Sequence, residues 1–573
     1  MLRATRGLNY AALAAAALAC LTFGVGDVSD PLLLIWLRTV QWSAIALGML
    51  VAVVHRRWLP LPVMVPLAIW LGVLALSAAL APVHRDEALS SLARPVSGAM
   101  LAWAVYAMSS SRGRWLFLNL ALAAGGLGVA VVGLAELAGI APVRVWLAAL
   151  HDRLVPVADV PRLSSLLSHP NVAASVLELT LPLVVAAAVL APRGWRFPLA
   201  AALLLHLAAL GLTFSRAGVL AALSALGVLA ALAARHGARR VLAPVGVAAL
   251  AAPVTFGLAA ATLPQVEHRM LAELEQASYR ATYAAPAQVT VAPDQMVEVP
   301  VTVTNASSND WTALDASRVA LGYHLLRADG TPLEFDCPAT LVPADLASHA
   351  SLAMRAQLRA PRQVGRYVVE WDALREGVAW FSWRGSPTTT TALVVEPNAP
   401  ALPAPSEADE VVLPRPGRIQ YWLAAWAIVR DYPLLGVGPD NFRLRFTDYT
   451  GAEESHIGTH AHSLYFESLA DSGVLGFVAL CGFLIGLARS LKRGLAADRD
   501  WLWRGALMAS LAAWLVHGVV DDFERFLPTH LVFWVVVGLA VRGRAAPGEF
   551  KQSNPRAARR SFDKLVQRAQ RPE

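Results

Sequence analysis

The residues best suited to acid–base chemistry are His460 and His462, in the stretch HAHSLYFESLADSGVLG at 460–476. This stretch ends a long polar segment and leads into an apolar helix of membrane-spanning length. Histidine exchanges its proton near neutral pH, so it can act there as a general base. Aromatic and aliphatic residues follow His462 at helical spacing, so a partly buried structural histidine is the alternative for this residue.

His456 is a third imidazole close to His460 and His462, and three histidines raise the question of a zinc site. No clear set of cysteine or glutamate residues completes a four-coordinate site beside them. The three cysteines of the chain are scattered between apolar segments and loop, which indicates neither a disulfide framework nor a cysteine metal site. We therefore expect chemistry without a metal or another cofactor.

Two arginines are placed to bind an anion. Arg216 lies in LTFSRAGVL, between two nearly contiguous apolar helices. An arginine at the centre of a span costs about 2.5–3.5 kcal/mol on insertion scales, so Arg216 needs the interface or an anionic partner. Arg418 begins an amphipathic helix after a Pro-rich segment. Both side chains could instead be ordinary interfacial arginines that extend to the membrane surface.

Composition places these residues in a polytopic membrane protein. Of 573 residues, 56% are hydrophobic and 16% are charged. Apolar runs long enough to cross a bilayer recur about twelve times. We expect these spans at 9–26, 31–54, 59–81, 92–108, 115–139, 171–191, 197–214, 217–234, 241–262, 473–488, 502–520 and 528–541.

Alternate loops between the spans carry the basic residues. Lys and Arg are retained on the cytoplasmic side, so both termini should be cytoplasmic and the long segment 263–472 should face outward. The intervening loops carry acids, among them Asp521. This topology accounts for the net charge of +7, so we expect no nucleic-acid partner. The basic loop residues are Arg56, Arg57, Arg112, Arg114, Arg193, Arg196, Arg235, Arg239, Arg240, Lys492 and Arg493.

Within the outer segment, residues 286–397 alternate apolar and polar residues and carry turn signals such as Asp329-Gly330. About seven short strands of this kind fit one antiparallel β-sandwich. The segment weakly resembles the immunoglobulin-like domains appended to bacterial surface-glycan proteins. Its tryptophans are either core residues or a face that stacks on sugars. They are Trp311, Trp371, Trp380 and Trp383.

Several motifs outside this segment together resemble the O-antigen ligase and polymerase superfamily. His462 and Ser463 are followed by Gly473 and Gly476 at the family's spacing. The run PLLGVG at 433–438, the pair Ser215-Arg216 and the island His169-Pro170-Asn171 also fit its pattern and order. The resemblance covers nearly all the chain outside the sandwich. Many family members have a shorter outer loop, so the inserted sandwich leaves the acceptor open.

The resemblance implies a metal-independent glycosyltransferase of the C type in the bacterial plasma membrane. Its donor would be an undecaprenyl-diphosphate-linked glycan, and its acceptor a glycan, a lipid or a protein. His462 would be the general base, while Arg216 and Arg418 would hold the diphosphate. Direct displacement at the sugar carbon predicts inversion. The further candidates for substrate positioning are Arg162, Asn171, His460 and Asp521.

Two other classes of protein remain open at this point. A flippase or transporter of lipid-linked glycans would also use outward cations, but it favours charges within the spans, where Arg38 is the main example. A membrane-anchored glycan-binding protein would need far fewer spans. Besides membrane lipids, other glycan-assembly proteins are compatible partners.

The expected fold is an α-helical bundle of about twelve spans with an outward all-β sandwich inserted between the ninth and tenth. The expected units are a membrane domain with nine spans (1–262), a connector (263–285), the sandwich (286–397), a Pro-rich linker (398–416), a catalytic outer loop with amphipathic helices (417–472), spans ten to twelve (473–545) and a basic cytoplasmic tail (546–573).

Overall fold

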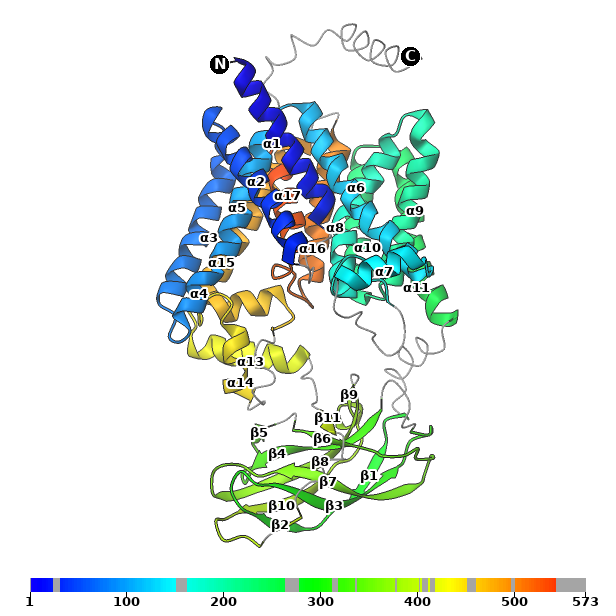
Figure 1. Cartoon of the computed structure of the whole chain (residues 1–573), viewed down its shortest axis with the longest axis vertical. Helices are drawn as coiled ribbons and strands as arrows, with labels where there is room; N and C mark the ends of the chain where they lie inside the picture. The colour runs from blue at the N-terminus through cyan, green and yellow to red at the C-terminus, as the bar shows by residue number, and fades with distance from the viewer. Residues whose placement is uncertain are drawn as a thin grey trace.

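The chain forms a bundle of long helices and a separate set of β-sheets (Figure 1). The computed structural model describes residues 2–23, 31–150, 162–262, 278–311, 318–334, 337–376, 379–400, 402–403, 411–412, 418–450, 460–495 and 500–542. Much of the expected connector and linker, His456 and almost all of the expected tail lie outside these residues.

Every expected span coincides with a helix of the bundle. These helices are α1 (Leu2–Thr22), α2 (Pro31–Val54), α3 (Leu61–Ala79), α5 (Ala93–Met108), α6 (Arg112–Leu137), α8 (Pro170–Leu190), α9 (Arg196–Leu212), α10 (Arg216–Arg235), α11 (Arg239–Thr262), α15 (Leu464–Leu495), α16 (Trp501–His517) and α17 (Leu527–Ala540). Within the described part of the chain, eight helices are long and apolar enough to cross a membrane. The protein is therefore multi-pass, and the number twelve stays a prediction.

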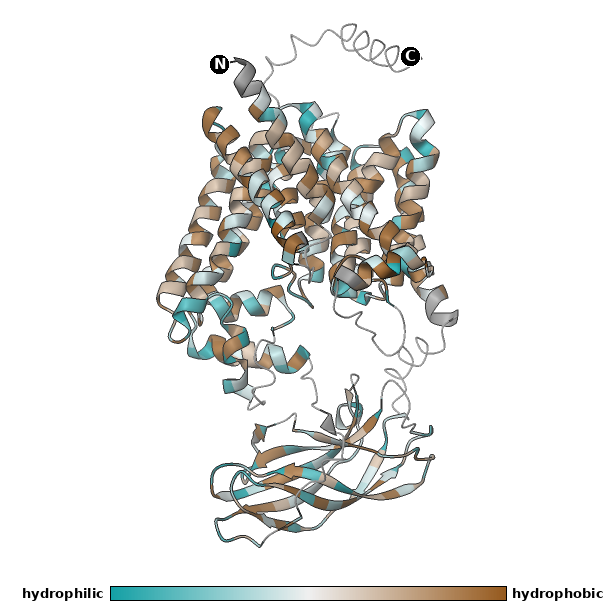
Figure 2. Ribbon diagram, in the orientation of Figure 1, coloured by the Kyte–Doolittle hydropathy of each residue, from teal (hydrophilic) through white to brown (hydrophobic). Residues whose placement is uncertain are grey.

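The surface of the bundle is apolar, as a lipid-facing surface must be. Figure 2 shows that hydrophobic residues predominate along the helices of the bundle, whereas the strands mix hydrophobic and hydrophilic residues. Large apolar side chains such as Phe197, Leu32 and Leu250 are mostly exposed. Soluble monomers rarely expose contiguous patches of this kind.

Helix α8 forms the centre of the bundle and carries one end of the site. From Pro170 to Ala187 nearly all of its side chains are buried, and it packs against α6, α9, α10 and α16. A helix that is apolar on all sides belongs in such a position. His169 caps its N-terminus by accepting a hydrogen bond from the Asn171 amide at 3.1 Å, which places Asn171 at the outer end of the bundle core.

Among the residues that the structure describes, four shorter helices lie beside the bundle. They are α4 (Arg85–Ser91), α7 (Ala141–Leu150), α13 (Arg418–Asp431) and α14 (Phe442–Thr450). Helices α13 and α14 lie at the end of the bundle that faces the β-sheets, and α1 begins at the opposite end (Figure 1). Helix α13 buries Tyr421 and Ile428 against α14 and α15 and exposes Ile419, Leu423 and Trp426.

Helix α15 is kinked at Gly473, which has φ 63° and ψ −170°. At the kink, backbone amides of Val437 and Gly438 donate to the carbonyls of Ala470 and Asp471, at 3.0 and 2.9 Å. The amide of Val474 donates in return to Pro433, at 2.9 Å. We call the paired segments 433–438 and 470–475 the junction. Such close backbone approach requires glycine, because a Cβ on Gly436 or Gly473 would overlap the facing backbone.

The junction is also attached to α3. The Ser77 hydroxyl lies within hydrogen-bonding distance of the Leu435 carbonyl, at 2.6 Å, and of the Asp471 carbonyl, at 3.0 Å. The motif residues Gly473 and Gly436 therefore have a structural purpose. They fix the start of α15, and with it the loop that holds His462.

The β-sheets comprise a three-stranded sheet of order β1-β3-β7 and a larger sheet of order β11-β6-β4-β8-β10-β2, with β5 on β4 and β9 on β8. All pairings are antiparallel except β10 with β2. The strands are β1 (Ala281–Ala284), β2 (Gln288–Val291), β3 (Met296–Asn305), β4 (Val319–Arg327), β5 (Pro332–Glu334), β6 (Ala339–Leu341), β7 (Ser351–Arg359), β8 (Gly365–Arg375), β9 (Ala379–Trp380), β10 (Thr389–Val395) and β11 (Val411–Val412).

The strands extend beyond the expected limits of 286–397, since β1 pairs with β3 and β11 pairs with β6. Trp311, Trp371 and Trp380 are buried, and the Trp371 indole Nε1 donates to the Thr391 hydroxyl at 2.9 Å. These three tryptophans are core residues, so they offer no face for stacking on sugars. Trp383 alone of the four is substantially exposed.

Candidate active site

His462 lies in the loop just before α15, where the ends of α8, α13 and α16 come together. Its φ of 45° is unusual for a residue with a side chain. The end of the loop is fixed, because the amide of Leu464, two residues after His462, donates to the Gly518 carbonyl at 2.9 Å. The side chain itself remains 42% exposed, so a substrate can reach it.

The partner of His462 is Asp521, in the loop after α16. His462 Nδ1 lies 3.3 Å from Asp521 Oδ1, and the Asp521 side chain is only 10% exposed. A proton on Nδ1 that is donated to this carboxylate leaves Nε2 free to accept another proton. The pair thus has the arrangement of a histidine oriented by an aspartate.

Asp521 is held in turn by two residues that the sequence placed among the positioning candidates. Asn171 Nδ2 donates to Asp521 Oδ2 at 3.5 Å, and Arg162 donates to Asn171 Oδ1 at 3.1 Å. Arg162 Nε also donates to the Thr213 carbonyl at 2.8 Å. Three of the four candidates, Arg162, Asn171 and Asp521, therefore form one chain of contacts that ends at His462.

Charge keeps Asp521 ionised. Burial alone would raise its pKa, but the hydrogen bond to His462 and the electrostatic interactions with His462, His517 and Arg418 hold the pKa below its ordinary value of 3.8. The carboxylate is consequently negative at neutral pH and can stabilise an imidazolium on His462.

The two predicted anion-binding arginines lie at the ends of helices beside this group. Arg418 is the first residue of α13, and Tyr421 one turn later has its ring 5.3 Å from the His462 ring. Arg216 is exposed at the first position of α10, after the N-cap Ser215 and three residues after Thr213. A helix N-terminus adds positive potential to that of the guanidinium.

His460 belongs to a different set of contacts. Its Nδ1 lies 2.8 Å from Glu467 Oε1, and Glu467 also accepts the Ala461 amide at 2.6 Å. Of the four positioning candidates, His460 is thus the one that the structure separates from Asp521. Its place beside Glu467 suits a role in holding the 460–463 loop.

The structure also shows buried polar groups near the site that the sequence analysis did not single out. Asp471 is buried and accepts the amides of Asp440 and Phe442, at 2.7 and 2.9 Å. In the core beneath the site, His517 Nδ1 lies 2.8 Å from Glu178 Oε2. For these groups, the sequence offers one signal: Glu467 and Asp471 lie one helical turn apart, shortly before Gly473.

Among the described residues, no three histidine, cysteine, aspartate or glutamate side chains are grouped as metal ligands. The arrangement offers an imidazole that is oriented by a carboxylate and lies next to helix ends that begin with arginines.

Comparison with known families finds a match for the segment around His462. Residues 403–481 match the family model described as O-Antigen ligase. The match includes Arg418, the run 433–438, His462 and both motif glycines. No curated protein is found to be similar in sequence.

Proposed function

We propose that this chain, of which residues 403–481 match the O-antigen ligase family, transfers a glycan from an undecaprenyl-diphosphate carrier to an acceptor hydroxyl. The reaction takes place on the outer face of the bacterial plasma membrane. The observation that carries the proposal is the contact of His462 with Asp521 next to the first residues of α10 and α13.

The proposed chemistry is a single displacement. His462 Nε2 removes the proton of the acceptor hydroxyl as its oxygen attacks the anomeric carbon of the donor sugar. The bond between that carbon and the diphosphate oxygen breaks, and its electron pair leaves with the diphosphate. Asp521 stabilises the imidazolium, and Arg216 and Arg418 neutralise the charge that grows on the leaving group. Attack opposite the leaving group inverts the anomeric carbon.

Asp521 is predicted to act through His462. Replacement of Asp521 by asparagine should lower kcat by about 10–100-fold, since an amide cannot stabilise the imidazolium as a carboxylate does. The acidic limb of the rate profile should also move to lower pH. Rates measured between pH 5 and 9 test this. A profile that keeps its shape would contradict the role.

The arginines are predicted to act on the diphosphate. Arg216→Ala and Arg418→Ala should each weaken donor use by about 10-fold or more, and the lysine variants by less, because a lysine keeps the charge but not the fork of donors. The measurement is the rate of transfer at low and saturating donor. Equal losses for alanine and lysine at all donor concentrations would argue against contact with the diphosphate. Arg355→Ala, in the β-sheets and mostly exposed, is the matched control.

A flippase is the competing function, since outward cations would also serve it. The enzyme is favoured by the orientation of His462, because a transporter has no need for an imidazole held by a carboxylate. Movement of donor across vesicles by wild type and by the His462 variant alike, with no transfer product, would favour the flippase.

A further inference from the structure

A cavity of about 130 Å³, with a mainly apolar wall that also carries ionisable side chains, lies beside the 460–467 segment, between α3, α5, α15 and the loop before α17. Its walls include the apolar side chains Trp70, Leu74 and Leu480. Pockets for drug-sized ligands measure roughly 300–1,000 Å³, so a cavity of this size suits a group no larger than about one sugar ring.

The cavity adjoins the proposed base. Leu464 and Glu467 of its lining follow His462 within five residues, and Glu467 contacts both His460 and the Ala461 amide. Asp522 of its lining directly follows Asp521. A group bound there would lie next to the loop that carries His462, and apart from the arginine at the start of α10.

The charged lining is predominantly acidic. Five carboxylates face the cavity, against two arginines, Arg94 and Arg525. The carboxylates are Asp440, Glu467, Asp471, Asp522 and Glu524. Burial, together with the nearby charges of Glu467 and Glu524, raises the pKa of Asp522 well above its ordinary value, which favours its protonated form, a hydrogen-bond donor.

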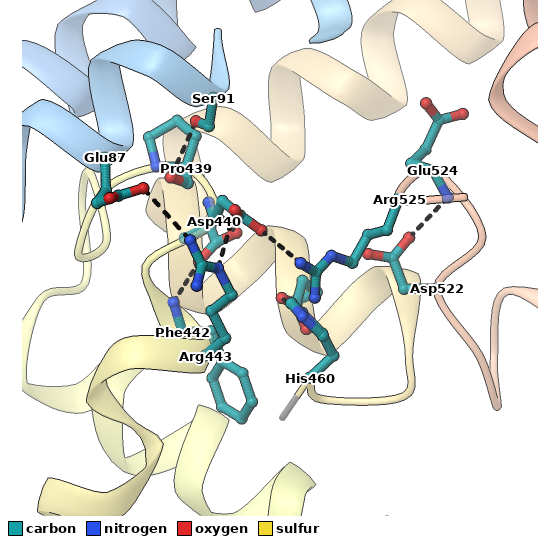
Figure 3. Close-up of polar contacts among 12 residues, drawn as sticks. Glu87, Ser91, Pro439, Asp440, Phe442, Arg443, His460, Asp522, Glu524 and Arg525 are labelled. Carbon is teal, nitrogen blue, oxygen red and sulfur yellow. Dashed lines mark hydrogen bonds and ion pairs between the residues drawn. The ribbon is translucent and has the colours of Figure 1, made fainter. Parts of the chain in front are cut away.

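The polar network around the cavity is incomplete. Asp440 lies between Arg443 and Arg525, at 3.0 and 3.4 Å, as Figure 3 shows. Glu524 Oε2 contacts His530 at 2.8 Å. Glu524 Oε1 and Arg525 Nε are enclosed and have no hydrogen-bond partner among the described residues. A buried acceptor and a buried donor in adjacent residues are thus both left unsatisfied, which favours a ligand with hydroxyl groups.

We propose that this cavity binds the acceptor sugar, and that the ring bound there carries hydroxyl groups and no phosphate. This rests on the proposed function. Carboxyl groups and arginines together hydrogen-bond the hydroxyls of a sugar, whereas a cavity of about 130 Å³ leaves no room for a phosphate beside the ring, and Arg525 is already paired with Asp440. The donor diphosphate, by contrast, is assigned to the arginines at the starts of α10 and α13. The two substrates then approach His462 from different sides.

Sugar binding can be measured separately from transfer. The full-length protein in lipid nanodiscs is mixed with methyl glucoside or with glucose 6-phosphate, and contact is detected by saturation-transfer difference NMR. We expect signals from methyl glucoside at least fivefold above those from glucose 6-phosphate in the wild type. Equal or stronger signals from the phosphate would overturn the proposal.

Two variants locate the binding. Glu524→Ala removes the unsatisfied acceptor, and Ser468→Phe fills the cavity without changing its charge. Each should reduce the methyl glucoside signal at least fivefold, whereas Glu376→Gln, in a partly exposed ion pair of the β-sheets, should leave it unchanged. Thermal unfolding checks that each variant is folded. If a folded Ser468→Phe variant keeps the full signal, the sugar binds elsewhere and the proposal is wrong.

The same variants separate this proposal from the glycosyltransferase assignment. In a transfer assay, Glu524→Ala should raise the acceptor concentration for half-maximal rate at least tenfold and leave that of the donor unchanged. If the wild type binds methyl glucoside but transfers no glycan, the assigned function fails and the sugar site stands. If transfer proceeds and neither cavity variant affects acceptor use, the site fails and the function stands.

Discussion

Replacement of His462 by alanine is expected to lower the rate of glycan transfer by about 10²–10⁴-fold, the usual contribution of a general base. The loss should fall on kcat, because the arginines that are assigned to the diphosphate remain in place. The measurement is transfer in vitro from a lipid-diphosphate donor, at saturating donor and acceptor.

The matched control is His55→Ala, since His55 is an exposed histidine just after α2. It should keep the wild-type rate. A wild-type rate for His462→Ala would mean that His462 is not the base. His462 would then be a structural residue, and the contact with Asp521 would serve only to hold the loop.

Replacement of Gly473 by alanine is expected to abolish transfer by a different route. The conformation at φ 63° and ψ −170° is essentially restricted to glycine, and strain of this kind costs about 1–3 kcal/mol. The added Cβ would in addition overlap the backbone of Leu434 and Leu435. Either the kink or the junction must then give way, so the variant should also show a lower thermal unfolding midpoint.

Gly482→Ala is the matched control for this change. Gly482 lies in the same helix, and an added Cβ would meet no atom within 4 Å. Alanine in a helix interior is favoured over glycine by about 0.5–1 kcal/mol, so this variant should be at least as stable as the wild type. If Gly473→Ala retained wild-type stability and activity, the junction would not position the site.

The positions of the helices could be predicted because apolar length is a strong signal. The grouping of Arg162, Asn171 and Asp521 with His462 could be anticipated only as a shared side of the membrane. Their order of contact depends on how α8 and α16 pack, and periodicity does not encode that. His460 shows the same limit. It lies only two residues before His462, yet it contacts Glu467 and not Asp521.

The acidic cavity was beyond the reach of sequence patterns. Asp440, Glu467 and Glu524 come from three segments that only the tertiary fold brings together.

The junction also bears on the order in which the protein is made. Ser77 reaches residues 358 and 394 positions later in the chain, whereas the β-strands pair within one contiguous segment. Domains generally fold as units, and earlier ones fold first during synthesis. The β-sheets can therefore fold before α3 makes its contacts with the junction. The loop with His462 gains its shape only when α15 arrives, so a nascent chain cannot act on glycan carriers before its last helices are inserted.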